Sequence, residues 1–95
     1  MSRKITDDAV RAFNNGYSFT RDNTRVEPTE NGAVLYLHGS PIARRGNGKV
    51  EICDGGYNSL TTRERLNGLS GVRVNNKGGD LHLNGEPWDG EWKTV

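Results

Sequence analysis

Apolar positions follow a helical spacing near the start of the chain. Thr6 is a suitable N-cap, and two aspartates follow it, where carboxylates favour the positive end of a helix dipole. Ala9, Val10 and Phe13 then form a short apolar stripe, and Gly16 can take the left-handed conformation that ends a helix. The pattern predicts a helix over about residues 7–15.

Beyond this helix, apolar and polar residues alternate, as in strands with one buried face. The alternation covers residues 17–20, 24–27, 33–38 and 49–53, and residues 41–44 can add an edge strand. Asn31-Gly32 and Gly46-Asn47-Gly48 provide turn residues between these runs. Successive strands joined by short turns predict an antiparallel meander.

A second helix is predicted over about residues 62–68. Thr61 and Glu64 have the spacing of a capping box, in which each side chain bonds to the backbone of the other residue. Gly68 is suited to the C-terminal cap. Residues 72–74 and 81–83 alternate again, so the predicted fold is α+β, with a mostly antiparallel sheet of about five or six strands and both helices on one side.

The length and the charge narrow the classes of function. A chain of 95 residues is expected to form a single domain, residues 1–95. The formal net charge is only +1, whereas dedicated nucleic-acid domains are often far more basic. The charge is uneven along the chain, however. Residues 40–49 contain basic and no acidic side chains, and residues 80–91 contain acidic side chains and neither Lys nor Arg.

Cysteine usage and the N-terminus indicate a cytoplasmic protein. The chain has one cysteine, Cys53, which excludes an internal disulfide framework and fits a reducing compartment. The basic residues Arg3 and Lys4 are not followed by an apolar segment of the kind found in signal peptides. No apolar run is long enough to span a bilayer, so no membrane association is expected.

Several short motifs, in this order, resemble a family of small, uncharacterised proteins encoded by tailed bacteriophages. The likeness covers nearly the whole chain and is carried by residues 23–26 (Asn-Thr-Arg-Val), 35–39 (Leu-Tyr-Leu-His-Gly), 42–43 (Ile-Ala), 61–67 (Thr-Thr-Arg-Glu-Arg-Leu-Asn), 83–85 (Leu-Asn-Gly) and 88–90 (Trp-Asp-Gly). The resemblance implies an accessory protein that acts in the cytoplasm of the bacterial host. It brings no catalytic residues with it.

The residues themselves do not suggest catalysis or a metal site. Cys53 lies at the end of an apolar strand beside Asp54, which would raise the pKa of the thiol and so disfavour a nucleophilic thiolate. His38 and His82 complete the set of soft metal ligands, but no zinc spacing is present. We therefore expect a protein that is not an enzyme and needs no cofactor or metal.

Basic residues near two turns suggest binding of nucleic acid or a phosphate-bearing ligand. Hydroxyls and backbone N–H groups at the start of the second helix suit a phosphate, and an aromatic ring before it could stack on a base. The candidate residues are Arg44, Arg45, Lys49, Tyr57, Thr62, Arg63 and Arg65. The competing interpretation is that the helix start is closed by its own capping box and that Arg63 and Arg65 are solvated.

The C-terminal end offers an alternative, a protein-binding site. Trp88, Asp89 and Trp92 combine two large aromatic rings with acidic neighbours, which is typical of interfaces. Either ring could instead complete the core. An exposed strand edge would also allow a homodimer, with or without a small-ligand pocket at its interface.

Two hypotheses about function follow from the sequence. In the first, a non-enzymatic phage accessory protein binds nucleic acid or a phosphate-bearing ligand through the basic patch. In the second, the protein modulates a bacterial host factor, or sequesters a small ligand, through its tryptophan-containing end or a dimer interface. The first requires steep salt dependence, and the second requires an exposed tryptophan.

Overall fold

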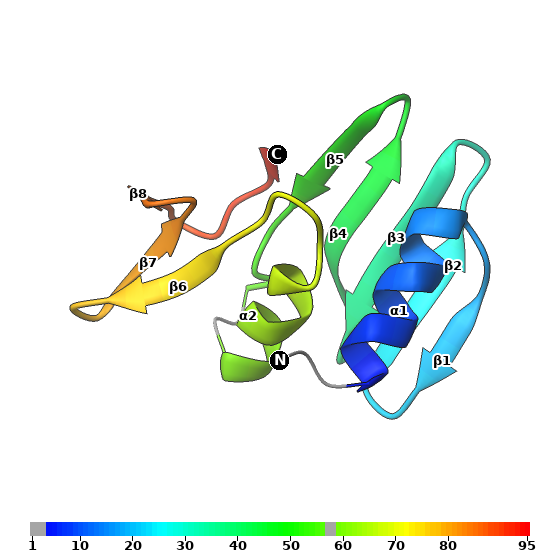
Figure 1. Ribbon diagram of the computed structural model, residues 1–95, viewed down its shortest axis with the longest axis horizontal. Helices are drawn as coiled ribbons and strands as arrows, with labels where there is room; N and C mark the ends of the chain where they lie inside the picture. The colour runs from blue at the N-terminus through cyan, green and yellow to red at the C-terminus, as the bar shows by residue number, and fades with distance from the viewer. Residues whose placement is uncertain (1–3, 57–58) are drawn as a thin grey trace.

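The computed structural model describes residues 4–56 and 59–95 and contains two helices and two antiparallel sheets (Figure 1). The helices are α1 (Lys4–Asn15) and α2 (Leu60–Asn67). The strands are β1 (Phe19–Arg21), β2 (Thr24–Pro28), β3 (Gly32–Leu37), β4 (Ser40–Gly46), β5 (Lys49–Ile52), β6 (Val74–Lys77), β7 (Asp80–Leu83), β8 (Glu86–Pro87) and β9 (Lys93–Thr94). The α+β class is confirmed. No helix in the described ranges is long and apolar enough to cross a membrane.

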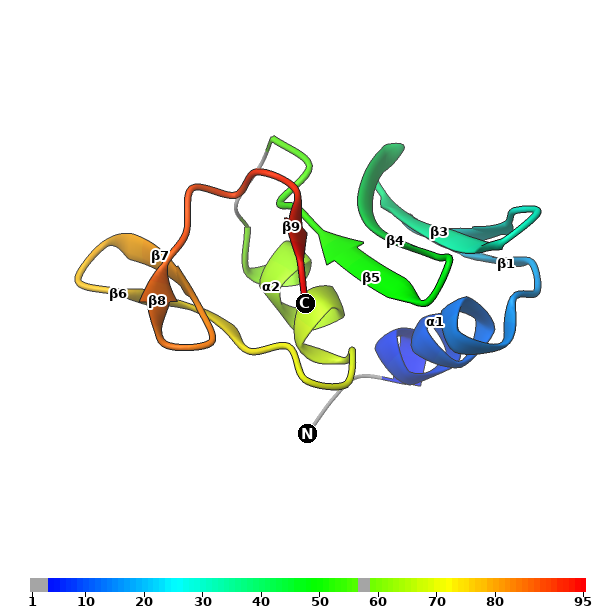
Figure 2. The ribbon, with the colours of Figure 1, turned by 90° about the horizontal axis from the view of Figure 1, so that it is seen from above.

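Six strands form the main sheet in the order β1-β2-β3-β4-β5-β9. Both helices lie on one face of it, as Figure 2 shows from above, and within the two described ranges the opposite face carries no helix. On the helix face, Leu35 pairs with Val26 on one side and Ala43 on the other, and all three are buried. The core forms there because strand side chains alternate between faces, so every second residue meets the helices.

The C-terminal strands form a separate small sheet, in the order β6-β7-β8, instead of extending the main one. Val74, Leu83 and Trp88 bury its inner side and join the same core cluster as Leu35 and Phe13. After Trp88 the chain arches back to the main sheet, where β9 pairs with Glu51 and Ile52 of β5 (Figure 2).

Two-residue turns with positive φ at both positions account for several of the hairpins. Asn47-Gly48 has this geometry, as the sequence predicts, and so does Asn84-Gly85. His38-Gly39 has it too, with φ of 52° at His38. His38 therefore lies in the turn that follows β3 and not in the strand predicted over residues 33–38.

The predicted helix caps need correction. Thr6 is buried inside α1, which begins at Lys4. The N-cap of α2 is Ser59 rather than Thr61, and the Ser59 hydroxyl accepts a hydrogen bond from the Thr62 backbone N–H. Gly68 is the C-cap as expected. It has an additional role, because a Cβ at this position would collide with Thr6, so the missing side chain lets α2 approach α1.

Candidate functional site

The predicted basic patch is not assembled. Arg44 and Arg45 are neighbours on β4, so their side chains leave opposite faces of the sheet. Arg44 donates from Nε to Glu51 at 2.9 Å on the helix-free face. Arg45 donates from Nε to the Phe13 carbonyl at 3.0 Å, at the end of α1. One ligand on one face therefore cannot contact both guanidinium groups.

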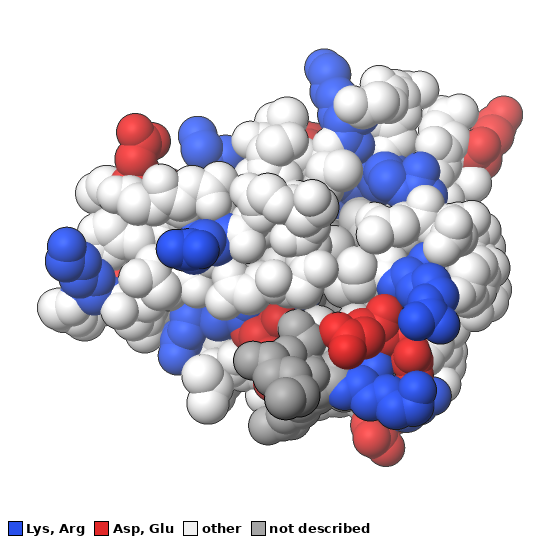
Figure 3. Space-filling view, in the orientation of Figure 1, with Lys and Arg blue, Asp and Glu red and all other residues white. Residues whose placement is uncertain are grey.

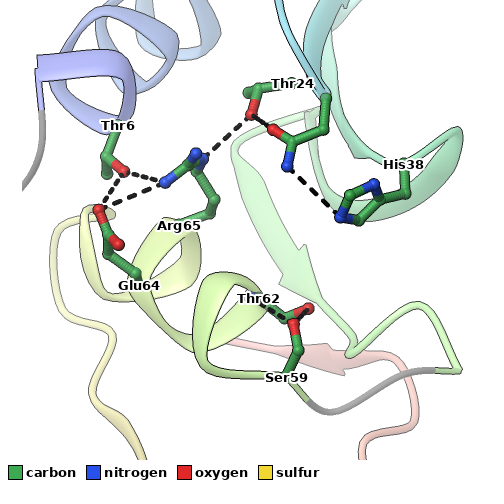
Figure 4. A network of polar contacts seen from close by, with 8 residues as sticks. Thr6, Thr24, His38, Ser59, Thr62, Glu64 and Arg65 are labelled. Carbon is green, nitrogen blue, oxygen red and sulfur yellow. Dashed lines mark hydrogen bonds and ion pairs between the residues drawn. The ribbon is translucent and has the colours of Figure 1, made fainter.

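Arg65 is buried, with 2% of its surface exposed, so the interpretation that it is solvated is wrong, and little of its surface is accessible to a phosphate. Its Nε donates to Thr24 Oγ1 at 3.0 Å, and an Nη donates to Thr6 Oγ1 at 2.7 Å and approaches Glu64 Oε1 at 3.3 Å. Figure 4 shows the guanidinium between α1, β2 and α2. Arg65 is a structural residue that joins three elements.

The other predicted phosphate-binding residues are dispersed. Thr62 is buried beneath the start of α2, Arg63 is half-buried on the same helix, and Lys49 is exposed at the beginning of β5. Tyr57 lies outside the described residues. On the face in Figure 3, the blue side chains are separate from one another, and several lie beside red ones. On this face of the described part of the chain, the Lys and Arg side chains form no continuous basic surface.

His38, His82 and Cys53 lie in separate surroundings. The His82 Nδ1 is 3.0 Å from the Asp80 carbonyl, and the His38 Nε2 is 3.4 Å from the Asn23 side-chain nitrogen. Cys53 is buried, its thiol donates to the Pro41 carbonyl, and burial raises the pKa of that thiol. Among residues 4–56 and 59–95, no three His, Cys, Asp or Glu side chains form a group that could hold a metal ion.

The alternative site at the C-terminal end has a definite geometry. An open groove of about 700 Å³ lies between the small sheet and the tail, and we name it the tail groove. It is lined by the four residues of β7, the two residues of β8, and Trp88, Asp89, Glu91, Trp92 and Lys93. All three residues of the alternative prediction, Trp88, Asp89 and Trp92, therefore lie in one groove.

The two tryptophans have different environments. Trp88 is 9% exposed, and its Nε1 donates to the Glu91 carbonyl at 2.9 Å, so this ring completes the core of the small sheet. Trp92 is only half-buried, and the Arg44 guanidinium lies 4.0 Å from its ring centroid. The sequence leaves open which ring is buried, and the structure assigns burial to Trp88.

Comparison with known protein families identifies the origin of the chain. Residues 2–94 match the model of the Kyanoviridae Gp96 protein family. The chain belongs to that family. This membership confirms the resemblance to small phage proteins. No curated protein and no solved structure matches this phage protein. The function of the candidate site is therefore inferred from its own geometry.

Proposed function

We propose that this phage protein is a non-catalytic binding protein whose tail groove binds a segment of a protein partner. The expected partner is a factor of the bacterial host, encountered in the host cytoplasm. The observation that carries the proposal is the half-buried Trp92 in an open groove whose lining also contains Leu81, Leu83, Pro87 and Trp88. Large aromatic side chains in such positions supply much of the binding energy of protein interfaces.

The composition of the groove supports a protein ligand. Leu81, Leu83 and Pro87 provide apolar surface beside the two tryptophans, and carboxylates occupy other positions along the lining. An apolar centre with a polar rim is the usual organisation of a protein interface.

The tail is held in place by hydrogen bonds before any partner arrives. The backbone N–H of Trp88 donates to the Leu81 carbonyl at 3.0 Å, and the Glu91 N–H donates to Asp89 Oδ1 at 3.0 Å. The Asp54 N–H donates to the Gly90 carbonyl at 2.9 Å. A preformed groove loses less conformational entropy on binding than a flexible tail would.

The nucleic-acid hypothesis has less support from the geometry. Of the residues predicted for it, Thr62 and Arg65 are buried, and Arg44 and Arg45 lie on opposite faces of the main sheet. The acidic lining of the tail groove would in turn repel a phosphate backbone. We therefore prefer the protein-binding hypothesis.

Capture from extracts of the host bacterium tests this function. Wild-type protein, Trp92→Ala and Tyr17→Ala would be immobilised in equal amounts, after circular dichroism has shown that each is folded. Tyr17 is a matched control because it is an aromatic residue, 46% exposed, that follows α1 and does not line the tail groove.

A partner bound by the wild type and Tyr17→Ala, but lost with Trp92→Ala, is expected. Binding of the purified partner should then weaken by roughly tenfold or more in Trp92→Ala, as for an interface hot spot. Identical capture by all three proteins would refute the proposed role of the groove.

A further inference from the structure

The carboxylates of the tail groove lack cationic partners. Asp80, Glu86, Asp89 and Glu91 all line it, and within the described parts of the chain none of them forms an ion pair. Carboxylates elsewhere that do pair with lysine or arginine are Asp8, Glu27, Glu51 and Glu64. Lys93 is the one lysine or arginine among the lining residues, so the groove carries excess negative charge.

Trp92 already accepts a cation on its ring. The Arg44 guanidinium lies 4.0 Å from the ring centroid and is held there by Glu51, whose Oε1 is 2.9 Å from Arg44 Nε. Such stacking is favourable because the negative face of the indole attracts positive charge. Arg44 comes from the main sheet, whereas the lining of the groove comes from the small sheet and the tail. Arg44 is therefore not a lining residue, and none of the lining residues is an arginine.

We infer that the tail groove binds a basic, extended segment of its protein partner, with lysine or arginine side chains placed against the carboxylates that form no ion pair among the described residues. This inference rests on the proposed function and specifies the chemistry of the partner. Charge complementarity supports it, because an acidic lining attracts a basic segment and excludes an acidic one. The open form of the groove allows a chain to pass through it, which a closed pocket would not.

Synthetic peptides of one length and one Gly/Ser background test the inference. The same positions would carry Arg, Lys, Gln or Glu in four otherwise identical peptides. The chain has two tryptophans and both line the groove, so intrinsic fluorescence and the indole N–H signals in NMR spectra report binding there. Titrations at low and at physiological salt separate the electrostatic contribution.

Charge-neutralised variants provide the matched comparison. Glu86→Gln/Glu91→Gln removes two carboxylates from the groove, and Asp7→Asn/Glu30→Gln removes two exposed carboxylates that do not line it. The two double variants have the same net charge. Any general effect of charge would therefore appear in both.

The Arg and Lys peptides should bind and shift the indole signals, while the Glu peptide should not. The groove variant should weaken binding of the Arg peptide by about tenfold, since each exposed ion pair contributes up to ~1 kcal/mol. The control variant should bind as the wild type does. Higher salt should weaken the binding of both basic peptides.

Two results would overturn the inference while leaving the proposed function intact. One is equal or tighter binding of the Gln or Glu peptide in the groove. The other is no binding of any peptide while capture of a host protein still depends on Trp92. If no peptide binds and capture does not depend on Trp92, the proposed function fails together with the inference.

Discussion

Replacing Arg65 by alanine should destabilise the fold strongly. Its buried guanidinium bonds to Thr6 in α1 and Thr24 in β2 and pairs with Glu64, so one side chain joins the N-terminal helix, the sheet and α2 (Figure 4). In Arg65→Ala, both hydroxyls lose the Arg65 donor in a buried site, and the Glu64 carboxylate loses its ion pair with Arg65.

The magnitude follows from the burial of the partners. Breaking a buried ion pair by removing one member costs about 3–5 kcal/mol. The Glu64 side chain is 22% exposed and can regain some hydration, which favours the lower end, about 3 kcal/mol. For a domain of this size, that loss corresponds to a decrease in Tm of roughly 10–25 °C.

Urea denaturation and thermal melting followed by circular dichroism measure the effect. Arg11→Ala is the control, because Arg11 is an exposed arginine of α1 and its replacement should change stability by less than about 0.5 kcal/mol. Arg65→Lys should be intermediate, since an ammonium group retains the charge but not the guanidinium geometry. If Arg65→Ala were as stable as Arg11→Ala, the network would not contribute as we infer.

Three further predictions concern the core and the tail. Gly32→Ala should disrupt β3–β4 pairing, because its Cβ would collide with the Arg45 backbone, whereas a Cβ at Gly46, the residue paired with Gly32, would make only ordinary contacts with Asn31. Equal stability of the two variants in urea would contradict this. In single-tryptophan variants, acrylamide should quench Trp92 fluorescence much more than that of the buried Trp88, and reversed accessibilities would refute the assignment. Burial raises the pKa of the Cys53 thiol and limits access to it. Iodoacetamide at neutral pH should therefore modify the native protein far more slowly than the urea-unfolded protein. Equal rates would contradict this.

Local patterns predict most of the fold. Alternation over residues 33–38 and 49–53 identifies β3 and β5, and the Asn-Gly pair at residues 47–48 identifies the hairpin turn between β4 and β5. These features depend on neighbours in the sequence, so they can be recognised there. The separate small sheet could not be recognised, because strand pairing between distant segments is decided by tertiary packing.

The candidate sites were harder to predict for the same reason. Arg65 resembles a solvated helix residue until Thr6 and Thr24, distant in the sequence, are placed beside it. The separation of Arg44 and Arg45 could be predicted from the sequence, because adjacent side chains of a strand point to opposite faces of the sheet. The aromatic and acidic composition of residues 88–92 does predict an interface, but the groove also needs β7 and β8.

The last strand, β9, has two residues and closes the outer edge of β5, assisted by a hydrogen bond from the Val95 N–H to the Val50 carbonyl. The same stretch of chain supplies Trp92 and Lys93 to one wall of the tail groove. If the tail detached, it would open that wall and leave the β5 edge free to pair with a second copy. Self-association through that edge requires a detached tail, and capture of a partner requires the tail in place. The two events would therefore exclude each other.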